Sequence, residues 1–224
     1  MNGKLIIIES GSDASGKATQ TKKLYERLIL EGINIKRVEY PNYKSDSSAL
    51  VKMYLNGDFG RNPEDVSPYV SSTFYAVDRY ASFKTEWQED YLKGAVILAD
   101  RYTTSNMVHQ AVKLQGQEKD KFLEWLWNLE FELYKLPIPD FVIFLDMPPA
   151  ISQELMKERA NKFTGKENKD IHESNEEYLV NCYKNAQYIA NKYNWYKVSC
   201  VENGRLRSIE EIHEDIYNYI KKNI

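Results

Sequence analysis

Short apolar runs alternate with longer amphipathic stretches along this chain. Three of the runs, Leu5–Glu9, Ala95–Asp100 and Phe141–Asp146, are almost continuously apolar, as expected of strands buried on both faces of a parallel sheet. Ile33–Tyr40 and Trp195–Val201 are two further strand candidates. Strands that alternate with helical stretches predict an α/β fold, with a five-stranded, mostly parallel sheet flanked by helices.

The stretches between these runs have helical spacing and helical end signals. Ala18–Leu30 is followed by Gly32, which is typical of a helix and its stop. Glu118–Leu136 predicts an amphipathic helix, because apolar side chains recur at three- and four-residue steps. These apolar positions are Phe122, Trp125, Leu126, Leu129 and Leu133. Ser208, with Glu211 three residues later, predicts a capping box that begins the last helix.

Composition narrows the class of protein. With 224 residues, 42% of them hydrophobic and 28% charged, the chain has ordinary globular composition. No linker divides it, so we expect one domain over residues 1–224.

A net charge of −3 is no reason to expect nucleic acid or an acidic membrane as partner. The first apolar run has only four consecutive apolar residues, too few for a targeting segment or a membrane span. Two cysteines, Cys182 and Cys200, favour a reducing cytoplasm over secretion.

A glycine-rich loop follows the first predicted strand and precedes a predicted helix. Gly11–Lys17 reads GSDASGK, which matches the G-x-x-x-x-G-K part of a phosphate-binding loop. Backbone N–H groups and a helix N-terminus would converge there on an anion. The alternative is a strand–turn–helix connection that contains these residues by chance. The predicted ATP-binding residues are Gly11, Ser12, Asp13, Ala14, Ser15, Gly16, Lys17, Ala18 and Thr19.

One part of that loop motif is missing. Ala18 stands where the motif has a serine or threonine whose hydroxyl binds magnesium. Thr19 is rotated by about 100° on the helix and cannot simply replace it. Because Mg²⁺ keeps several waters and needs few protein ligands, we expect nucleotide binding to survive. The metal would be held by water, phosphates and nearby carboxylates.

Two further groups of residues suggest a site for a phosphate acceptor. Asp100 and Arg101 end a buried strand, where α/β sheets bind ligands, and an acid beside an arginine suits phosphoryl transfer. As an isolated dipeptide, the pair would more often be a surface ion pair. Tyr75 and Arg79 are four residues apart and would share a helix face, as a ring and a donor that read a base. The alternative is a core aromatic beside a solvated arginine.

Together these features resemble the thymidylate kinase family of P-loop nucleoside monophosphate kinases, over nearly the whole chain. The glycine loop alone is shared by many NTPases, but the ordered combination of motifs is far more specific. Besides the loop it includes YPNY, LNGDFG, FYAVDR, ADRYTTSN, PDFVIFLDMPP and KDIHESNEEYL. The resemblance implies a P-loop kinase fold with a short basic lid at about residues 157–170. It also implies transfer of the γ-phosphoryl group of ATP to dTMP with Mg²⁺, giving dTDP and ADP in dTTP biosynthesis, by a homodimer.

The resemblance also assigns roles to individual residues. The implied catalytic residues are Lys17, Asp100, Arg101 and, from the lid, Arg159 with Lys162 and Lys166 as helpers. Asp100 is in addition the candidate magnesium ligand, largely through water. The implied dTMP-binding residues are Asp13, Tyr43, Tyr75, Arg79, Arg101, Ser105, Asn106, Gln110 and Tyr178.

The chain departs from the family pattern at some positions, and two other functions stay open. Ser10 stands where the family usually has glutamate, and Glu9 would point to the opposite face of the strand. Asn42 replaces a frequent arginine, so Lys44 is a candidate substitute. The alternatives are a deoxynucleoside kinase with Glu9 or Asp100 as base, and a nucleotide-binding sensor that has lost catalysis. The apolar helix with Trp125 and Trp127 is a candidate dimer interface.

Overall fold

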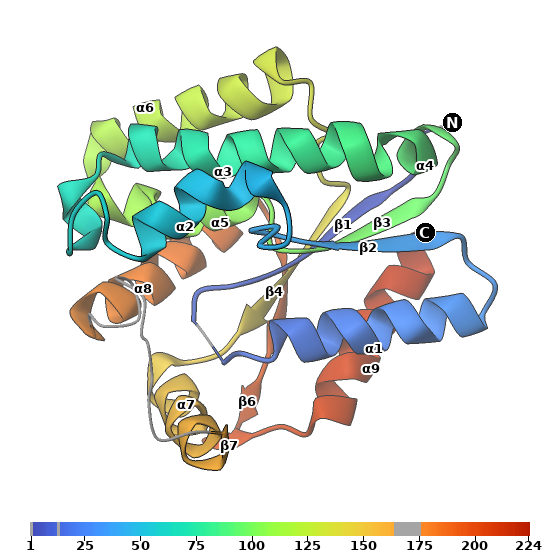
Figure 1. The fold of residues 1–224 in the computed structure, drawn as a ribbon. Helices are drawn as coiled ribbons and strands as arrows, with labels where there is room; N and C mark the ends of the chain where they lie inside the picture. Colours follow the sequence, from blue (N-terminus) through green and yellow to red (C-terminus); the bar gives the residue numbers. More distant parts are fainter. Residues whose placement is uncertain (1, 13, 164–175) are drawn as a thin grey trace.

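The computed structural model describes residues 2–12, 14–163 and 176–224, with side chains for 2–12, 14–156 and 177–224. Its centre is a sheet of five strands in the order β2-β3-β1-β4-β5, and every neighbouring pair is parallel (Figure 1). The strands are β1 (Leu5–Ser10), β2 (Ile35–Glu39), β3 (Val96–Asp100), β4 (Phe141–Asp146) and β5 (Tyr196–Ser199). All five predicted strands are confirmed, together with the α/β fold class.

Helices connect and cover these strands. Those before β3 are α1 (Lys17–Leu30), α2 (Ala49–Leu55), α3 (Pro68–Ser82) and α4 (Gln88–Leu92). Those after β3 are α5 (Thr103–His109), α6 (Gly116–Trp127), α7 (Pro149–Phe163), α8 (Glu176–Lys192) and α9 (Ile209–Asn223). Two short strands, β6 (Val201–Glu202) and β7 (Arg205–Leu206), form an antiparallel hairpin after β5.

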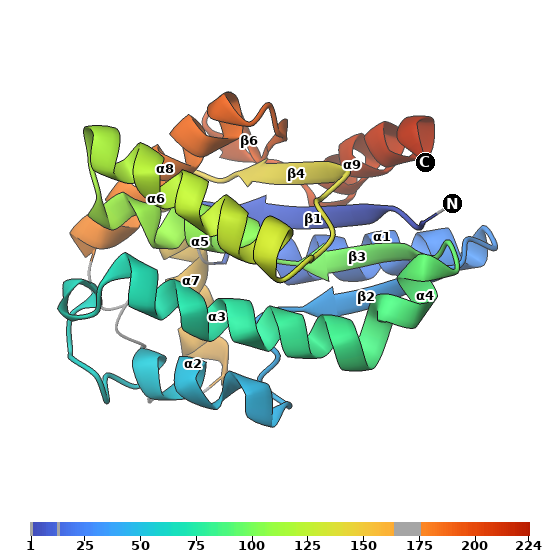
Figure 2. The same cartoon turned by 90° about the horizontal axis from the view of Figure 1, so that it is seen from above.

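The two faces of the sheet bury different sets of helices. Helices α1 and α9 cover one face, and α3, α5, α6 and α8 lie on the other (Figure 2). Along β1, Ile6 and Ile8 belong to the core on the α1 side, whereas Leu5 and Ile7 belong to the core on the opposite side. This alternation on a strand with no exposed residue explains why its sequence is almost continuously apolar.

The predicted helix ends are also confirmed. Gly32, which follows the C-cap residue Glu31 of α1, has a φ of +77°, a conformation that glycine adopts at low cost. At the other end of the chain, the Ser208 side chain accepts a hydrogen bond from the Glu211 backbone at 3.2 Å. The Glu211 carboxylate accepts one from the Ser208 backbone at 2.8 Å, which completes the capping box of α9.

The predicted helix over Glu118–Leu136 changes its character part of the way along. Helix α6 ends at Trp127 and continues as a π-helical turn over Asn128–Leu133. A π turn contains an extra residue, so side chains beyond it move to a different face. Leu133, which the helical spacing placed among the apolar positions, is accordingly 67% exposed, while Glu130 is fully buried.

No helix among the described residues is both long enough and apolar enough to cross a membrane.

Candidate active site

The glycine loop joins β1 to α1 at the carboxyl edge of the sheet. A side chain at Gly11 would place its Cβ 2.6 Å from the Cβ of Ala186 on α8, so only glycine allows this close approach. Gly16 has a φ of +85° and is the N-cap residue of α1. The loop therefore has the strand–loop–helix context that makes the phosphate-binding interpretation specific.

Lys17 lies in a small network of hydroxyl groups. Its ammonium donates to Ser10 Oγ at 2.7 Å and to the Ser12 carbonyl at 3.2 Å, and Ser15 Oγ also donates to Ser10 Oγ at 2.7 Å. The Ser12 hydroxyl in turn donates to the Met147 carbonyl beyond β4. Ser10, one of the departures from the family pattern, thus holds the lysine and orders the loop.

A first cavity opens over this loop, and six of the nine predicted ATP-binding residues line it. Its lining includes Ala14, Ser15, Gly16, Lys17, Ala18 and Thr19 from the loop and α1, with Asp100 and Arg101 from the end of β3. Gly11 and Ser12 are buried beneath it. Met147, Leu155, Arg207 and Ile209 also line it and were missed by sequence reasoning, because they come from distant segments.

A second cavity lies on the other side of Arg101. Seven of the residues predicted to bind dTMP line it: Tyr43, Tyr75, Arg79, Arg101, Ser105, Asn106 and Gln110. They come from the loop after β2, from α3 and from the β3–α5 region, so the fold brings together three segments that are far apart in the sequence. Tyr40, Pro41, Leu55, Tyr102, His109 and Leu179 complete the lining and were not predicted.

Arg101 is shared by the two cavities. It has a φ of +66°, an unfavourable conformation for a residue with a side chain, and such strain is concentrated at functional sites. Its backbone N–H donates to the Ile8 carbonyl at 3.2 Å, and its Nη1 lies 3.1 Å from His109 Nε2. The strand end thus fixes a guanidinium where the two cavities meet.

Polar side chains of the second cavity are oriented by neighbours on α3. Ser71 Oγ donates to Gln110 Oε1 at 2.7 Å, and the Asn106 amide donates to the Ser72 carbonyl at 3.3 Å. Tyr75 is half-buried and packs edge-on against Tyr54, with ring centroids 6.3 Å apart. These contacts hold an aromatic ring and two amides around one space, as recognition of a flat heterocycle requires.

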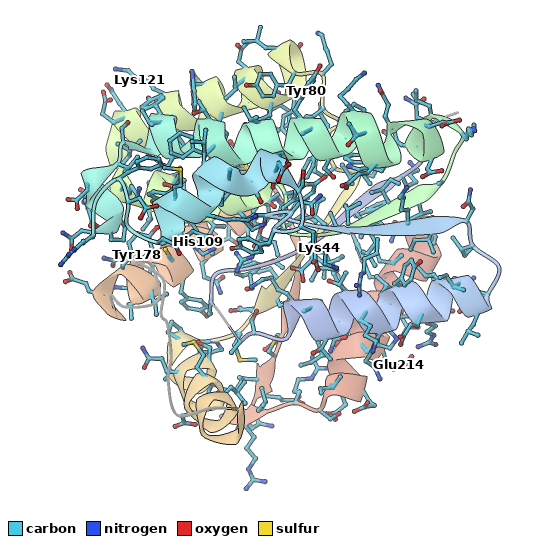
Figure 3. All side chains as sticks on the ribbon, in the orientation of Figure 1. Lys44, Tyr80, His109, Lys121, Tyr178 and Glu214 are labelled. Atoms are coloured by element: carbon cyan, nitrogen blue, oxygen red, sulfur yellow. The ribbon has the colours of Figure 1, made fainter. Side chains whose placement is uncertain are left out.

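Tyr178 lies near this cavity but is not part of its lining. Its ring is 4% exposed, and its hydroxyl donates to the His109 carbonyl at 2.5 Å. Figure 3 shows Tyr178 and His109 near one another, where α5 and α8 pack. Its predicted contact with the sugar stays a prediction.

Several predicted residues lie outside the described part of the chain. Asp13 is one of them, as are residues 164–170 of the predicted lid at 157–170. Arg159 and Lys162 fall within α7, but their side chains are not described, and Lys166 lies outside the described residues. The roles of these residues stay predictions.

Asp100 is a half-buried carboxyl group whose charge is costly. Desolvation raises its pKa above the usual 3.8, and the charges of Lys17 and Arg101 only partly oppose this, while Glu9 and Glu39 add to it. The pKa of this carboxyl group is therefore higher in the folded than in the unfolded chain. Such a group lowers the free energy of unfolding when it is ionised, and this effect is complete at pH values above its folded pKa.

We therefore expect Asp100→Asn to raise the melting temperature of the ligand-free protein at pH 7.5, while it lowers turnover. The gain should shrink as the pH falls through the folded pKa towards 3.8, because wild-type Asp100 then becomes neutral as well. Thermal unfolding at several pH values measures this. An unchanged or lower melting temperature at pH 7.5 would contradict desolvation as the cause of the raised pKa of Asp100.

The donor set of the first cavity suits a hydrated magnesium ion rather than a fully protein-bound one. Asp100 supplies a carboxylate to the lining, whereas Ala18 supplies no side-chain oxygen. Among the described residues there is no cluster of three or more His, Cys, Asp or Glu side chains that would form a closed metal site. One carboxylate together with substrate phosphates and water is a common Mg²⁺ arrangement.

Comparisons with known proteins agree with this geometry. The family model described as "Thymidylate kinase" matches residues 8–216. Thymidylate kinase of Mycobacterium tuberculosis is 30% identical over 164 residues, which cover 72% of this chain and 74% of the mycobacterial protein. That of Plasmodium falciparum is 26% identical over 98% of this chain and 90% of its own length. The solved thymidylate kinase of Candida albicans superposes with a TM-score of 0.69 at 20% identity, covering 99% and 92% of the two chains.

The sheet order, the glycine loop and these matches define a P-loop nucleoside monophosphate kinase. Together with the match over residues 8–216, they show that the chain belongs to the thymidylate kinase family. It is thus a phosphotransferase of the ATP-dependent nucleoside monophosphate kinase class.

Proposed function

We propose that this chain transfers the γ-phosphoryl group of ATP to dTMP, giving dTDP and ADP, as a step of dTTP biosynthesis. The observation that carries the proposal is the position of Arg101, at the junction of a cavity over the glycine loop and a cavity lined by the predicted dTMP residues. A donor and an acceptor bound in these two cavities would bring their phosphates to one guanidinium. The carboxyl end of a parallel sheet is where such ligands bind.

The first cavity would hold the ATP phosphates. The backbone N–H groups of the loop and the N-terminus of α1 favour an anion there. Lys17 would leave the Ser10 and Ser12 oxygens for the outer phosphates, which are stronger acceptors for an ammonium group. Asp100 would hold Mg²⁺ through water, and the ion would supply charge neutralisation between the β- and γ-phosphates.

The second cavity would hold dTMP. The ring of Tyr75 would stack on thymine, and Arg79 would donate to a base carbonyl, with the Asn106 and Gln110 amides on the pyrimidine edge. Arg101 would pair with the acceptor phosphate. Because that phosphate is already an anion, the reaction needs little general-base chemistry, and positioning and charge neutralisation would supply most of the rate.

A panel of nucleoside monophosphates tests this proposal. ADP release from ATP and Mg²⁺ is expected to be fastest with dTMP, and negligible with thymidine. Faster release with thymidine would favour a deoxynucleoside kinase, and ATP binding without any turnover would favour a sensor.

The structure disfavours Glu9 as the base that a deoxynucleoside kinase would need. Glu9 is fully buried, and it accepts hydrogen bonds from Thr104 Oγ1 at 2.8 Å and Ser105 Oγ at 2.6 Å. It also accepts one from the Ser10 backbone. A carboxylate held in this way is poorly placed to take a proton from a nucleoside hydroxyl.

We further propose a homodimer, but through α3 rather than through the two tryptophans. Trp125 and Trp127 are half-buried and pack within the chain, where the ring of Trp127 lies 4.6 Å from that of Phe131. A group of exposed apolar side chains lies on α3 and on the π-helical turn after α6. Val70, Val77 and Tyr80 share one face of α3, and Leu133 is 67% exposed. Together with Tyr134 and Phe83, three of these residues line a shallow groove.

Charge on this face should separate the subunits. We expect Val77→Glu to convert a dimer to a monomer, because it would place a carboxylate in an apolar contact. Leu30→Glu is the matched control, since Leu30 is 88% exposed at the end of α1 and should leave the dimer intact. Sedimentation velocity measures both. A wild-type monomer, or a Val77→Glu dimer, would contradict this interface.

A cytoplasmic location is part of the same proposal. Cys182 and Cys200 are both buried, and no disulfide forms between them in the described structure. Thiols of this kind suit a reducing compartment.

A further inference from the structure

Beneath the second cavity, Arg79 and Glu130 form a completely buried ion pair. Arg79 Nε donates to one carboxylate oxygen at 2.7 Å and Nη2 donates to the other at 2.5 Å. The side chains are 1% and 0% exposed. Removing both charges from water is costly, so such a pair adds little stability compared with apolar side chains of the same size. Its presence here calls for another explanation.

Glu130 is brought to this place by the π-helical turn and is held there by α5. The turn over Asn128–Leu133 buries Glu130 while it exposes Leu133. Thr103, the first residue of α5, donates its hydroxyl to Glu130 Oε2 at 2.6 Å. Glu130 therefore accepts three hydrogen bonds and links α3 to α5, two helices that both contribute side chains to the cavity lining. Turns of this kind occur frequently at functional sites.

Glu130 occupies one edge of the Arg79 guanidinium group, the edge formed by Nε and Nη2. Nε and one N–H of Nη2 are used by Glu130, whereas among the described residues Nη1 has a single, long contact of 3.4 Å to the Tyr102 carbonyl. Arg79 lines the cavity, whereas Glu130 does not. Although burial lowers the pKa of Arg79, the charge and hydrogen bonds of Glu130 raise it by more, so the group stays a cation. A fork of two hydrogen bonds fixes the plane of the guanidinium group.

We propose that Glu130, supported by Thr103, is a positioning residue that fixes Arg79 as a hydrogen-bond donor to a nucleobase carbonyl and so sets which base the acceptor cavity takes. This inference rests on the proposed function, in which that cavity holds the acceptor nucleotide. A guanidinium group has donors only, so a base that presents a carbonyl is accepted, and one that presents an amino group is rejected. Because Glu130 neutralises Arg79, this end of the cavity also favours the uncharged base over a phosphate.

The test compares dTMP with dCMP as acceptors, since thymine has a carbonyl where cytosine has an amino group. In Glu130→Gln, the amide keeps the size but replaces one acceptor oxygen by a donor, which breaks the fork. We expect the KM for dTMP to rise about tenfold, and the preference for dTMP over dCMP in kcat/KM to fall about tenfold, as for loss of one hydrogen bond to a charged group. The kcat for dTMP and the KM for ATP should change much less.

A second variant and a control make the result decisive. Thr103→Val removes one support of Glu130 with little change in shape, and should shift KM and preference in the same direction by a smaller factor. If Glu130→Gln does not fold, the Thr103→Val variant alone decides whether Glu130 positions Arg79. Glu132→Gln is the control, because Glu132 is exposed on the same turn.

Two outcomes would overturn the inference in distinguishable ways. A folded Glu130→Gln variant with an unchanged KM and preference overturns the role of Glu130 alone, as does an unchanged Thr103→Val variant where Glu130→Gln is unfolded. Wild-type protein that turns over no dTMP overturns the proposed function together with the inference.

Discussion

Replacing Arg101 with alanine is expected to lower kcat for dTMP phosphorylation by about 10³-fold or more, which is the lower end of the effect of an arginine on a transferring phosphoryl group. Arg101 lines both cavities, so its loss removes the charge at the point where donor and acceptor phosphates would meet. ATP binding should remain measurable, because the glycine loop and Lys17 are untouched. Steady-state kinetics and calorimetric titration with ATP measure the two effects.

Two variants control for charge and for geometry. Arg61→Ala removes an exposed arginine that lines neither cavity, and should leave kcat unchanged. Arg101→Lys keeps the charge but loses the forked donors, so it should recover only part of the rate. If Arg101→Ala turned over dTMP at the wild-type rate, the assigned meeting point of the phosphates would be wrong.

Lys17→Met is expected to have the other large effect, a loss of about 10³-fold in kcat/KM for ATP. Lys17 is 8% exposed, and its ammonium lies over the loop, within 3.2 Å of the Ser12 carbonyl. Methionine keeps much of the side chain's length but cannot neutralise a phosphate. Because the charge is needed for the outer phosphates in both the bound and the reacting state, binding and turnover should fall together.

The matched control lies one turn further along the same helix. Lys22→Met removes an exposed lysine whose side chain is 64% accessible and whose ion pair with Glu26 is long, at 3.7 Å. It should leave ATP kinetics unchanged. Equal effects of the two substitutions would show that the loss at Lys17 reflects charge in general and not its place in the loop.

The sequence was most informative where one local pattern determines the structure. The continuously apolar runs predicted the strands, because a strand that is buried on both faces has no solvent-exposed face on which polar side chains would alternate. The glycine loop was recognisable for a similar reason, since Gly16 meets a requirement for left-handed backbone that acts within a few residues. The close packing of Gly11 against Ala186, in contrast, appears only in the folded chain. The hairpin of β6 and β7 also had a local signal, Asn203–Gly204, both with positive φ, that was missed.

What could not be predicted depends on segments that meet only in the folded chain. Nothing in the sequence around Glu130 indicates that it pairs with Arg79, 51 residues away. A regular helix over Glu118–Leu136 would have placed Leu133 in the core, and a single π turn changes that register. The contribution of His109 to the second cavity likewise follows from how α5 packs, and not from any motif.

The most direct test of the two-cavity arrangement is a crystal structure of the chain with dTMP and a non-hydrolysable ATP analogue. Thymine is expected against Tyr75 and Arg79, with the dTMP phosphate and the terminal phosphate of the ATP analogue both within hydrogen-bonding distance of Arg101. A thymine ring bound anywhere else, or acceptor and donor phosphates that do not meet at Arg101, would contradict the account.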